Sequence, residues 1–155
     1  MIAKEMTSGI PTEKFGRAGH DAKMQMAFYL RRAFAEAPDI YVFNDLPLER
    51  NGEVAHIDHL VFHRYGFVII ESKSVTGTIT VNEKGEFTRT FDGYASGMQS
   101  PIHQAKLLMK LLNDHERLRR KVLFGLQQGE FGEVRFKKLV AILTRALLSV
   151  SVATT

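Results

Sequence analysis

The sequence contains no cysteine and no long apolar run, and both absences narrow what the protein can be. Without cysteine among 155 residues, disulfide frameworks and thiolate-bound zinc sites are excluded. No apolar stretch approaches the roughly 18 residues that a membrane span needs. Residues 1–11 mix charged and small residues, unlike a signal peptide. We therefore expect a cytoplasmic protein without a membrane partner.

The composition is that of an ordinary globular protein. Hydrophobic residues make up 45% of the chain and charged residues 25%, and its 155 residues suffice for one domain with a substantial core. The formal net charge is +4, and the isoelectric point is about 9.4. This basic balance permits a polyanionic partner such as nucleic acid without requiring one.

Hydrophobic periodicity predicts two long helices and a sheet. Residues 1–15 are expected to be an irregular lead-in, and residues 146–155 a tail that is frayed or truncated. A helix is predicted over residues 19–35, with Asp21 as its cap or first-turn acid. A second helix opens at Ser100-Pro101 and runs to about residue 119, after a loop over residues 92–100. Strands are predicted over residues 40–50, 54–63, 67–73, 77–81, 87–91 and 138–144. This order predicts an α/β or α+β domain with a mixed sheet.

Two carboxylates and an ammonium group are expected to meet at one end of this sheet. Asp58 lies in one predicted strand, and Glu71 and Lys73 end the apolar run of the next. Alternate residues of a strand share a face, so Glu71 and Lys73 point the same way. A hairpin between the two strands brings Asp58 beside them. Because Glu71 leaves a core strand, its carboxylate needs a partner. The set suits a divalent metal with an attacking water, and equally a polar network inside the core.

The histidines near Asp58 raise the alternative of a zinc site. His56 and Asp58 share one face of their strand, whereas His59 faces the other. One strand therefore offers two ligands, and the remaining histidines are scattered along the chain. We do not favour a histidine-dominated zinc site.

Lys23 is a charged residue on the apolar stripe of the first predicted helix. It lies four residues before Ala27, on the same side of that helix. Its side chain is therefore expected to point towards whatever the helix packs on. There it either snorkels from the end of the stripe or reaches the candidate site.

Five motifs follow one another along the chain. They are Gly19 before the first helix, Ile57-Asp58-His59, Gly66-Phe67-Val68-Ile69-Ile70-Glu71-Ser72-Lys73, Gly77-Thr78-Ile79 and Ser100-Pro101-Ile102-His103-Gln104-Ala105. Together they resemble the nuclease-related domain, NERD, of the restriction-endonuclease-like PD-(D/E)xK superfamily. In that superfamily an aspartate precedes a Glu-x-Lys motif, as Asp58 precedes Glu71-Ser72-Lys73 here. The resemblance covers residues 16–145.

The resemblance implies a restriction-endonuclease-like core, in which two long helices flank a central mixed sheet, and a bacterial source. It implies that Asp58 and Glu71 hold Mg²⁺ or Mn²⁺. Lys73 would then orient the attacking water or stabilise the transition state. Gln104, which matches the family's Pro-x-x-Gln motif, would line the same site.

The chain departs from the family pattern at Lys23. The family usually has Gly-x-x-Gly-Glu at the start of the first helix, where this chain reads Gly19-His20-Asp21-Ala22-Lys23. An ammonium group in place of a carboxylate is expected to weaken metal binding. His20 and Asp21 are the candidate substitutes, although both are displaced along the helix. A smaller departure is His56, where glutamine is common.

The sequence thus predicts a metal-dependent nuclease that hydrolyses the phosphodiester bonds of nucleic acid, with DNA favoured over RNA. Two alternatives stay open. The first, motivated by Lys23, is a nuclease-like domain of little or no activity that binds nucleic acid or a protein partner. The second is a structural or regulatory domain whose acidic cluster is only a polar network, since fold does not imply function. The oligomeric state is left open.

Overall fold

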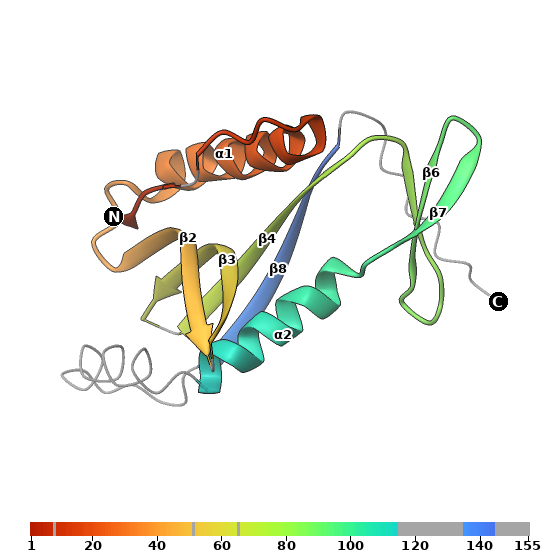
Figure 1. Cartoon of the computed structure of the whole chain (residues 1–155). Helices are drawn as coiled ribbons and strands as arrows, with labels where there is room; N and C mark the ends of the chain where they lie inside the picture. Colours follow the sequence, from red (N-terminus) through yellow and green to blue (C-terminus); the bar gives the residue numbers. More distant parts are fainter. Residues whose placement is uncertain (8, 51, 65, 115–134, 145–155) are drawn as a thin grey trace.

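In the part of the chain that the structure describes, two helices and two β-sheets form an α+β fold (Figure 1). The structure is a computed structural model that describes residues 1–7, 9–50, 52–64, 66–114 and 135–144. The predicted tail over residues 146–155 and the predicted end of the second helix over residues 115–119 lie outside the described residues. Within the described part, no helix combines the length and the apolar character needed to cross a bilayer.

The larger sheet is mixed, as the sequence predicts. Its strand order is β1-β2-β3-β4-β8. β3 runs antiparallel to both β2 and β4, whereas β1 runs parallel to β2, and β8 runs parallel to β4. The strands are β1 (Ile2–Lys4), β2 (Ile40–Arg50), β3 (Glu53–His63), β4 (Gly66–Val75) and β8 (Arg135–Thr144).

The two helices cover opposite faces of this sheet (Figure 1). α1 (Lys14–Phe34) packs Leu30 against β2, β3 and β4 in one apolar cluster. α2 (Pro101–Asp114) packs Leu108 and Leu112 on the other face, in a cluster that includes Ile57 and Ile69. β4 therefore has apolar partners on both faces, which explains its almost unbroken apolar run.

The N-terminal region is more ordered than the sequence predicts. Residues 2–4 form β1 beside β2, in the segment expected to be an irregular lead-in. α1 begins at Lys14 rather than near residue 19. Asp21 therefore lies inside the helix and is exposed, so the prediction that it caps the helix or sits in its first turn was wrong. Gly9, Pro11 and Gly16 obscured the helix start, although Gly16 lies within the first turn of α1 and only the other two precede it.

The start of α2 is as predicted. The side-chain oxygen of Ser100 accepts a hydrogen bond from the backbone N–H of His103 at 3.3 Å. The backbone N–H of Gln104 donates to the carbonyl oxygen of Ser100 at 3.1 Å. Pro101 follows at the first helical position, where its missing N–H costs nothing. This cap fixes the place of Gln104 on the first turn of α2.

The smaller sheet stands beside the larger one as an arm (Figure 1). We use this name for residues 78–98, which form the antiparallel strands β5 (Thr78–Val81), β6 (Phe87–Phe91) and β7 (Tyr94–Met98). Ile79 and Phe87 of the arm form a small apolar cluster with Val75, the last residue of β4. The prediction of a loop over residues 92–100 was wrong for β7, because alanine, serine and glycine disfavour strands and pairing with β6 decides the outcome.

The apolar cluster beneath α2 is expected to carry much of the stability. Ile57 on β3 is fully buried there, whereas Val54 on the same strand is 56% exposed. Ile57→Ala removes buried methyl groups and leaves a cavity, so we expect it to lower the free energy of unfolding by about 2–5 kcal/mol. Val54→Ala is the matched control, with an expected change of less than about 0.5 kcal/mol. Urea denaturation measures both, and equal effects would contradict this assignment of the core.

Candidate active site

The candidate site lies where β3 and β4 separate. Their ladder runs from the pair His63 and Gly66 to the pair His59 and Ile70. Beyond it, Oδ2 of Asp58 accepts a hydrogen bond from the backbone N–H of the β4 residue Ser72, at 2.9 Å. A side chain thus satisfies a backbone donor at the end of the ladder. The carboxylate of Asp58 is buried between the two strands as a result.

Lys23 reaches this carboxylate from α1. Its Nζ lies 2.6 Å from Oδ1 of Asp58, and the exposed fractions of the two side chains are 30% and 5%. The prediction that Lys23 points inward is therefore confirmed, and of its two interpretations the structure favours the one in which it reaches the site. Both oxygens of Asp58 are engaged, one by an ammonium group and one by a backbone N–H.

Glu71, Lys73 and Gln104 form the second half of the site. Nζ of Lys73 lies 2.8 Å from Oε1 of Glu71 and donates to Oε1 of Gln104, also at 2.8 Å. The predicted alignment of Glu71 with Lys73 is thus confirmed, and α2 brings Gln104 to the same ammonium group. Oε2 of Glu71 is buried and has no hydrogen-bond partner among the described residues.

The positive charges near Glu71 do not fully stabilise its ionised carboxylate. Burial raises the pKa of Glu71 above its ordinary value, and the nearby charge of Asp58 raises it further. The hydrogen bond from Lys73 and the charges of both lysines act in the opposite direction without cancelling the rise. A further cation beside Oε2 would favour the ionised form.

A buried histidine supports the strand end that carries Asp58. The ring of His59 is fully buried, with Nδ1 2.8 Å from Oδ1 of Asn44 and Nε2 3.1 Å from Oγ of Ser72. Because Oδ1 of Asn44 only accepts, Nδ1 carries the proton, and Nε2 accepts from the Ser72 hydroxyl. Burial lowers the pKa of His59 to about 4, the charge of Lys23 lowers it as well, and the carboxylate of Asp58 opposes the change.

This supporting network was missed in the sequence, although one signal pointed to it. A hairpin centred on residues 51–52 pairs Asn44 with His59, as the register of β2 and β3 shows. The two polar side chains therefore share a face, and the buried neighbour Ser72 lies close by on β4. His59 does face away from the position of Asp58, as strand alternation predicts.

The other predicted accessory residues lie outside the site. His56 is exposed and its Nδ1 lies 3.2 Å from Oδ1 of Asp45. Asp45 has a left-handed backbone with φ 51°, which interrupts the regular pleat of β2 next to His56. Among the described residues, His20 and Asp21 make no hydrogen bond or ion pair with the site. They lie on α1, three and two residues before Lys23.

The donors present suit a hard divalent cation in kind. Carboxylate oxygens are the ligands that Mg²⁺ and Mn²⁺ prefer, and the buried Oε2 of Glu71 has no hydrogen-bond partner among the described residues. The described residues bring no group of three His, Cys, Asp or Glu together, so the site offers two carboxylates. The ammonium group of Lys23 already holds Oδ1 of Asp58. Asp58 and Glu71 are therefore the residues that would hold such an ion, and Lys23 competes for one of them.

Comparison with known families shows the family of the chain. The family described as nuclease-related domain, NERD, matches residues 18–142, which include both halves of the site. The chain belongs to the nuclease-related domain family. No curated protein and no solved structure gives a significant match. Membership in this family agrees with the resemblance that the motifs show, and it suggests a nuclease-related function.

The buried His59 is expected to make the stability of this nuclease-related domain depend on pH. The unfolded chain takes up a proton at His59 near pH 6.5, whereas the folded chain does so only near pH 4. The contribution of neutral His59 is therefore complete above pH 6.5 and is lost as the pH falls towards 4, by roughly 3 kcal/mol in all. Urea unfolding at a series of pH values measures this loss.

His59→Gln is expected to flatten the stability profile between pH 6.5 and 4, and His103→Gln, at an exposed histidine of α2, serves as the control. The raised pKa of Glu71 gives a slope of the opposite sign, but the glutamate is present in every variant, so the difference between profiles isolates His59. An unchanged profile in His59→Gln would contradict the assignment.

Proposed function

We propose that the domain is a metal-dependent nuclease that hydrolyses phosphodiester bonds, with DNA favoured as the substrate. Asp58 and Glu71 would hold Mg²⁺ or Mn²⁺. The observation that carries the proposal is the buried Oε2 of Glu71, which lacks a partner among the described residues beside a second carboxylate. A buried carboxylate oxygen left in this state is costly unless a ligand completes it.

Each residue of the site would have a separate role in the reaction. When bound, the metal would supply positive charge to the scissile phosphate and lower the pKa of a bound water. The ammonium group of Lys73 is held between Glu71 and Gln104, so it is fixed in direction before a substrate arrives. From there it would orient the attacking water or stabilise charge that develops on the phosphate. Gln104 would position Lys73 through its side-chain oxygen.

A restriction-endonuclease-like core is part of this proposal. It is supported by the arrangement of α1, the antiparallel strands β2, β3 and β4, and then α2 followed by the parallel strand β8. In this arrangement β3 and β4 deliver the acidic residues at one end of the sheet, between the two helices. The fold alone does not settle the chemistry, so the function rests on the side chains.

A second candidate function follows from the ion pair of Lys23 and Asp58. The formal charges of Asp58, Glu71, Lys23 and Lys73 cancel, so the site lacks the net negative charge that attracts a divalent cation. On this basis the domain would bind metal weakly, cut slowly or not at all, and act by binding nucleic acid or a protein partner. The state of Lys23 separates the two candidates.

The nuclease proposal predicts that the purified protein cleaves plasmid DNA with Mg²⁺ or Mn²⁺ and not with EDTA. Glu71→Ala and Lys73→Ala are each expected to lower the rate by at least about 100-fold, because one removes a metal ligand and the other an electrostatic contact to the phosphate. Single-stranded RNA is the comparison substrate. Cleavage that persists in both variants would rule out this site as its source.

Lys23→Glu tests the metal site without relying on cleavage. The change replaces the competing ammonium group beside Asp58 by a carboxylate, so we expect the affinity for Mg²⁺, measured by calorimetry, to rise by about tenfold or more. Lys110→Glu makes the same change of charge at an exposed position of α2 and should leave the affinity unaltered. Equal affinities in the wild type and Lys23→Glu would remove Lys23 from the metal site.

The same experiment distinguishes the two candidate functions. If the wild type neither binds Mg²⁺ nor cleaves DNA while Lys23→Glu does both, the chain is the nuclease-like domain of little activity. If the wild type cleaves DNA, Nζ of Lys23 must leave Asp58 when metal binds. In that case Mg²⁺ should raise the melting temperature of the wild type, because a ligand that binds the folded state stabilises it.

A further inference from the structure

A groove lies between the arm and the start of α2. It has a volume of about 860 Å³ and is lined by the turn between β5 and β6, the end of β7 and the first two turns of α2. Its lining combines basic groups, one acid and apolar surface. The lining includes Lys84, Glu86, Met98, Ile102, His103 and Lys106.

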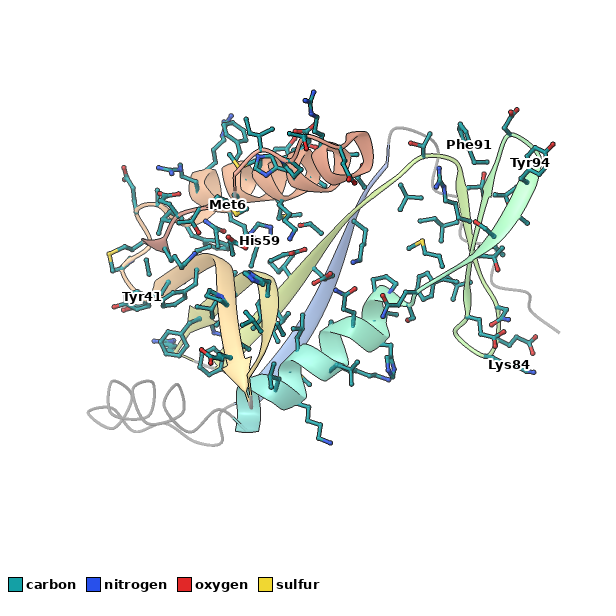
Figure 2. The ribbon with its side chains drawn as sticks, viewed as in Figure 1. Met6, Tyr41, His59, Lys84, Phe91 and Tyr94 are labelled. Atoms are coloured by element: carbon teal, nitrogen blue, oxygen red, sulfur yellow. The ribbon has the colours of Figure 1, made fainter. Side chains whose placement is uncertain are left out.

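The basic side of the groove is held in place by a built turn. Oδ1 of Asn82 accepts hydrogen bonds from the backbone N–H groups of Lys84 at 3.1 Å and Glu86 at 2.9 Å. The backbone N–H of Gly85, at φ 74°, donates to the carbonyl oxygen of Asn82 at 2.9 Å. The backbone of Lys84 is thus fixed, with its exposed side chain at the end of the arm away from Phe91 and Tyr94 (Figure 2).

The second basic group comes from the helix that also serves the site. His103 and Lys106 on α2 line the groove and are exposed. Gln104, between them in the chain, bonds Nζ of Lys73. α2 therefore contributes His103 and Lys106 to the groove and Gln104 to the candidate active site. The groove and the candidate site thus share the first turns of α2.

The apolar part of the lining narrows the class of ligand. Ile102, which lines the groove, is 41% exposed, and Met98, also in the lining, is half-buried. The backbone of a nucleic-acid duplex presents phosphates and sugars, whereas a single strand also presents unstacked bases that cover apolar side chains. The one acid, Glu86, accepts a hydrogen bond from Nδ2 of Asn82 at 2.6 Å, so its carboxylate is already engaged.

We infer that this groove binds a single-stranded segment of nucleic acid, with phosphates on Lys84 and Lys106 and bases against Ile102. The inference rests on the proposed function, because both take nucleic acid as the ligand. It adds the surface that holds the strand outside the site of Asp58 and Glu71. The basic charge of the chain, +4 in formal terms, agrees with a polyanionic ligand.

Binding of a short fluorescein-labelled single-stranded DNA, followed by fluorescence anisotropy in EDTA, tests the groove without cleavage. Lys84→Ala and Lys106→Ala are each expected to weaken binding about threefold. Each should also reduce the slope of log K against log salt concentration by about 0.7, the loss of one phosphate contact on a single strand. Glu86→Gln removes the only acid named in the lining and is expected to tighten binding. Lys110→Ala, one turn beyond Lys106 and outside the groove, is the matched control and should bind as the wild type does.

Three results would overturn the inference. In the first, neither lysine variant binds more weakly than Lys110→Ala. In the second, a duplex of the same sequence binds as tightly as the single strand and is equally sensitive to both lysines, which excludes the single-stranded ligand. In the third, polyglutamate displaces the DNA at equal charge concentration, which reduces the groove to a non-specific basic surface.

The two proposals fail separately. Groove-dependent binding by a protein that does not cleave DNA would leave the groove standing and remove the nuclease activity. Cleavage that depends on Glu71, in a protein whose binding ignores Lys84 and Lys106, would leave the nuclease standing and remove the groove. Thermal unfolding of each variant shows that the surface changes have not altered the fold.

Discussion

The two contacts of the Asp58 carboxylate hold the centre of this structure together. One oxygen accepts the backbone N–H of Ser72, where the ladder of β3 and β4 ends. The other takes the ammonium group of Lys23 from α1. The Asp58 carboxylate is buried, so loss of its ammonium partner would leave a buried charge uncompensated. These contacts therefore tie the position of α1 to the point at which the two strands separate.

Charge balance gives the departure at Lys23 its physical meaning. A glutamate, as in the family pattern, would place three acids and one lysine at the site, and such a site needs an added cation to be stable. Lys23 instead places a positive charge from the protein itself 2.6 Å from Oδ1 of Asp58. The buried Glu71 still has an oxygen without a partner among the described residues. The formal charges of the four side chains therefore sum to zero, but the contacts are uneven. Both oxygens of Asp58 have partners, whereas Oε2 of Glu71 has none among the described residues.

Local signals in the sequence predicted the strands that carry the site, and contacts between strands decided the rest. The apolar run before Glu71 and the helical spacing that aims Lys23 inward both act over a few residues. The partner of Lys23 could not be read in this way, because it depends on where β3 and β4 part. The support of Asp58 by His59 depends on the register of three strands. β7 was missed because its residues have little strand propensity and pair only through β6.

The place of the arm in the chain explains why a groove adjoins the site. The chain leaves the large sheet at Val75, two residues after Lys73, and α2 begins after Ser100, four residues before Gln104. The hydrogen bond from Lys73 to Gln104 therefore joins the two segments from which the arm projects. A bond at this point restrains both attachments of the arm relative to the sheet. Any ligand held between the arm and α2 is consequently held by segments that are fixed directly to the side chains of the site.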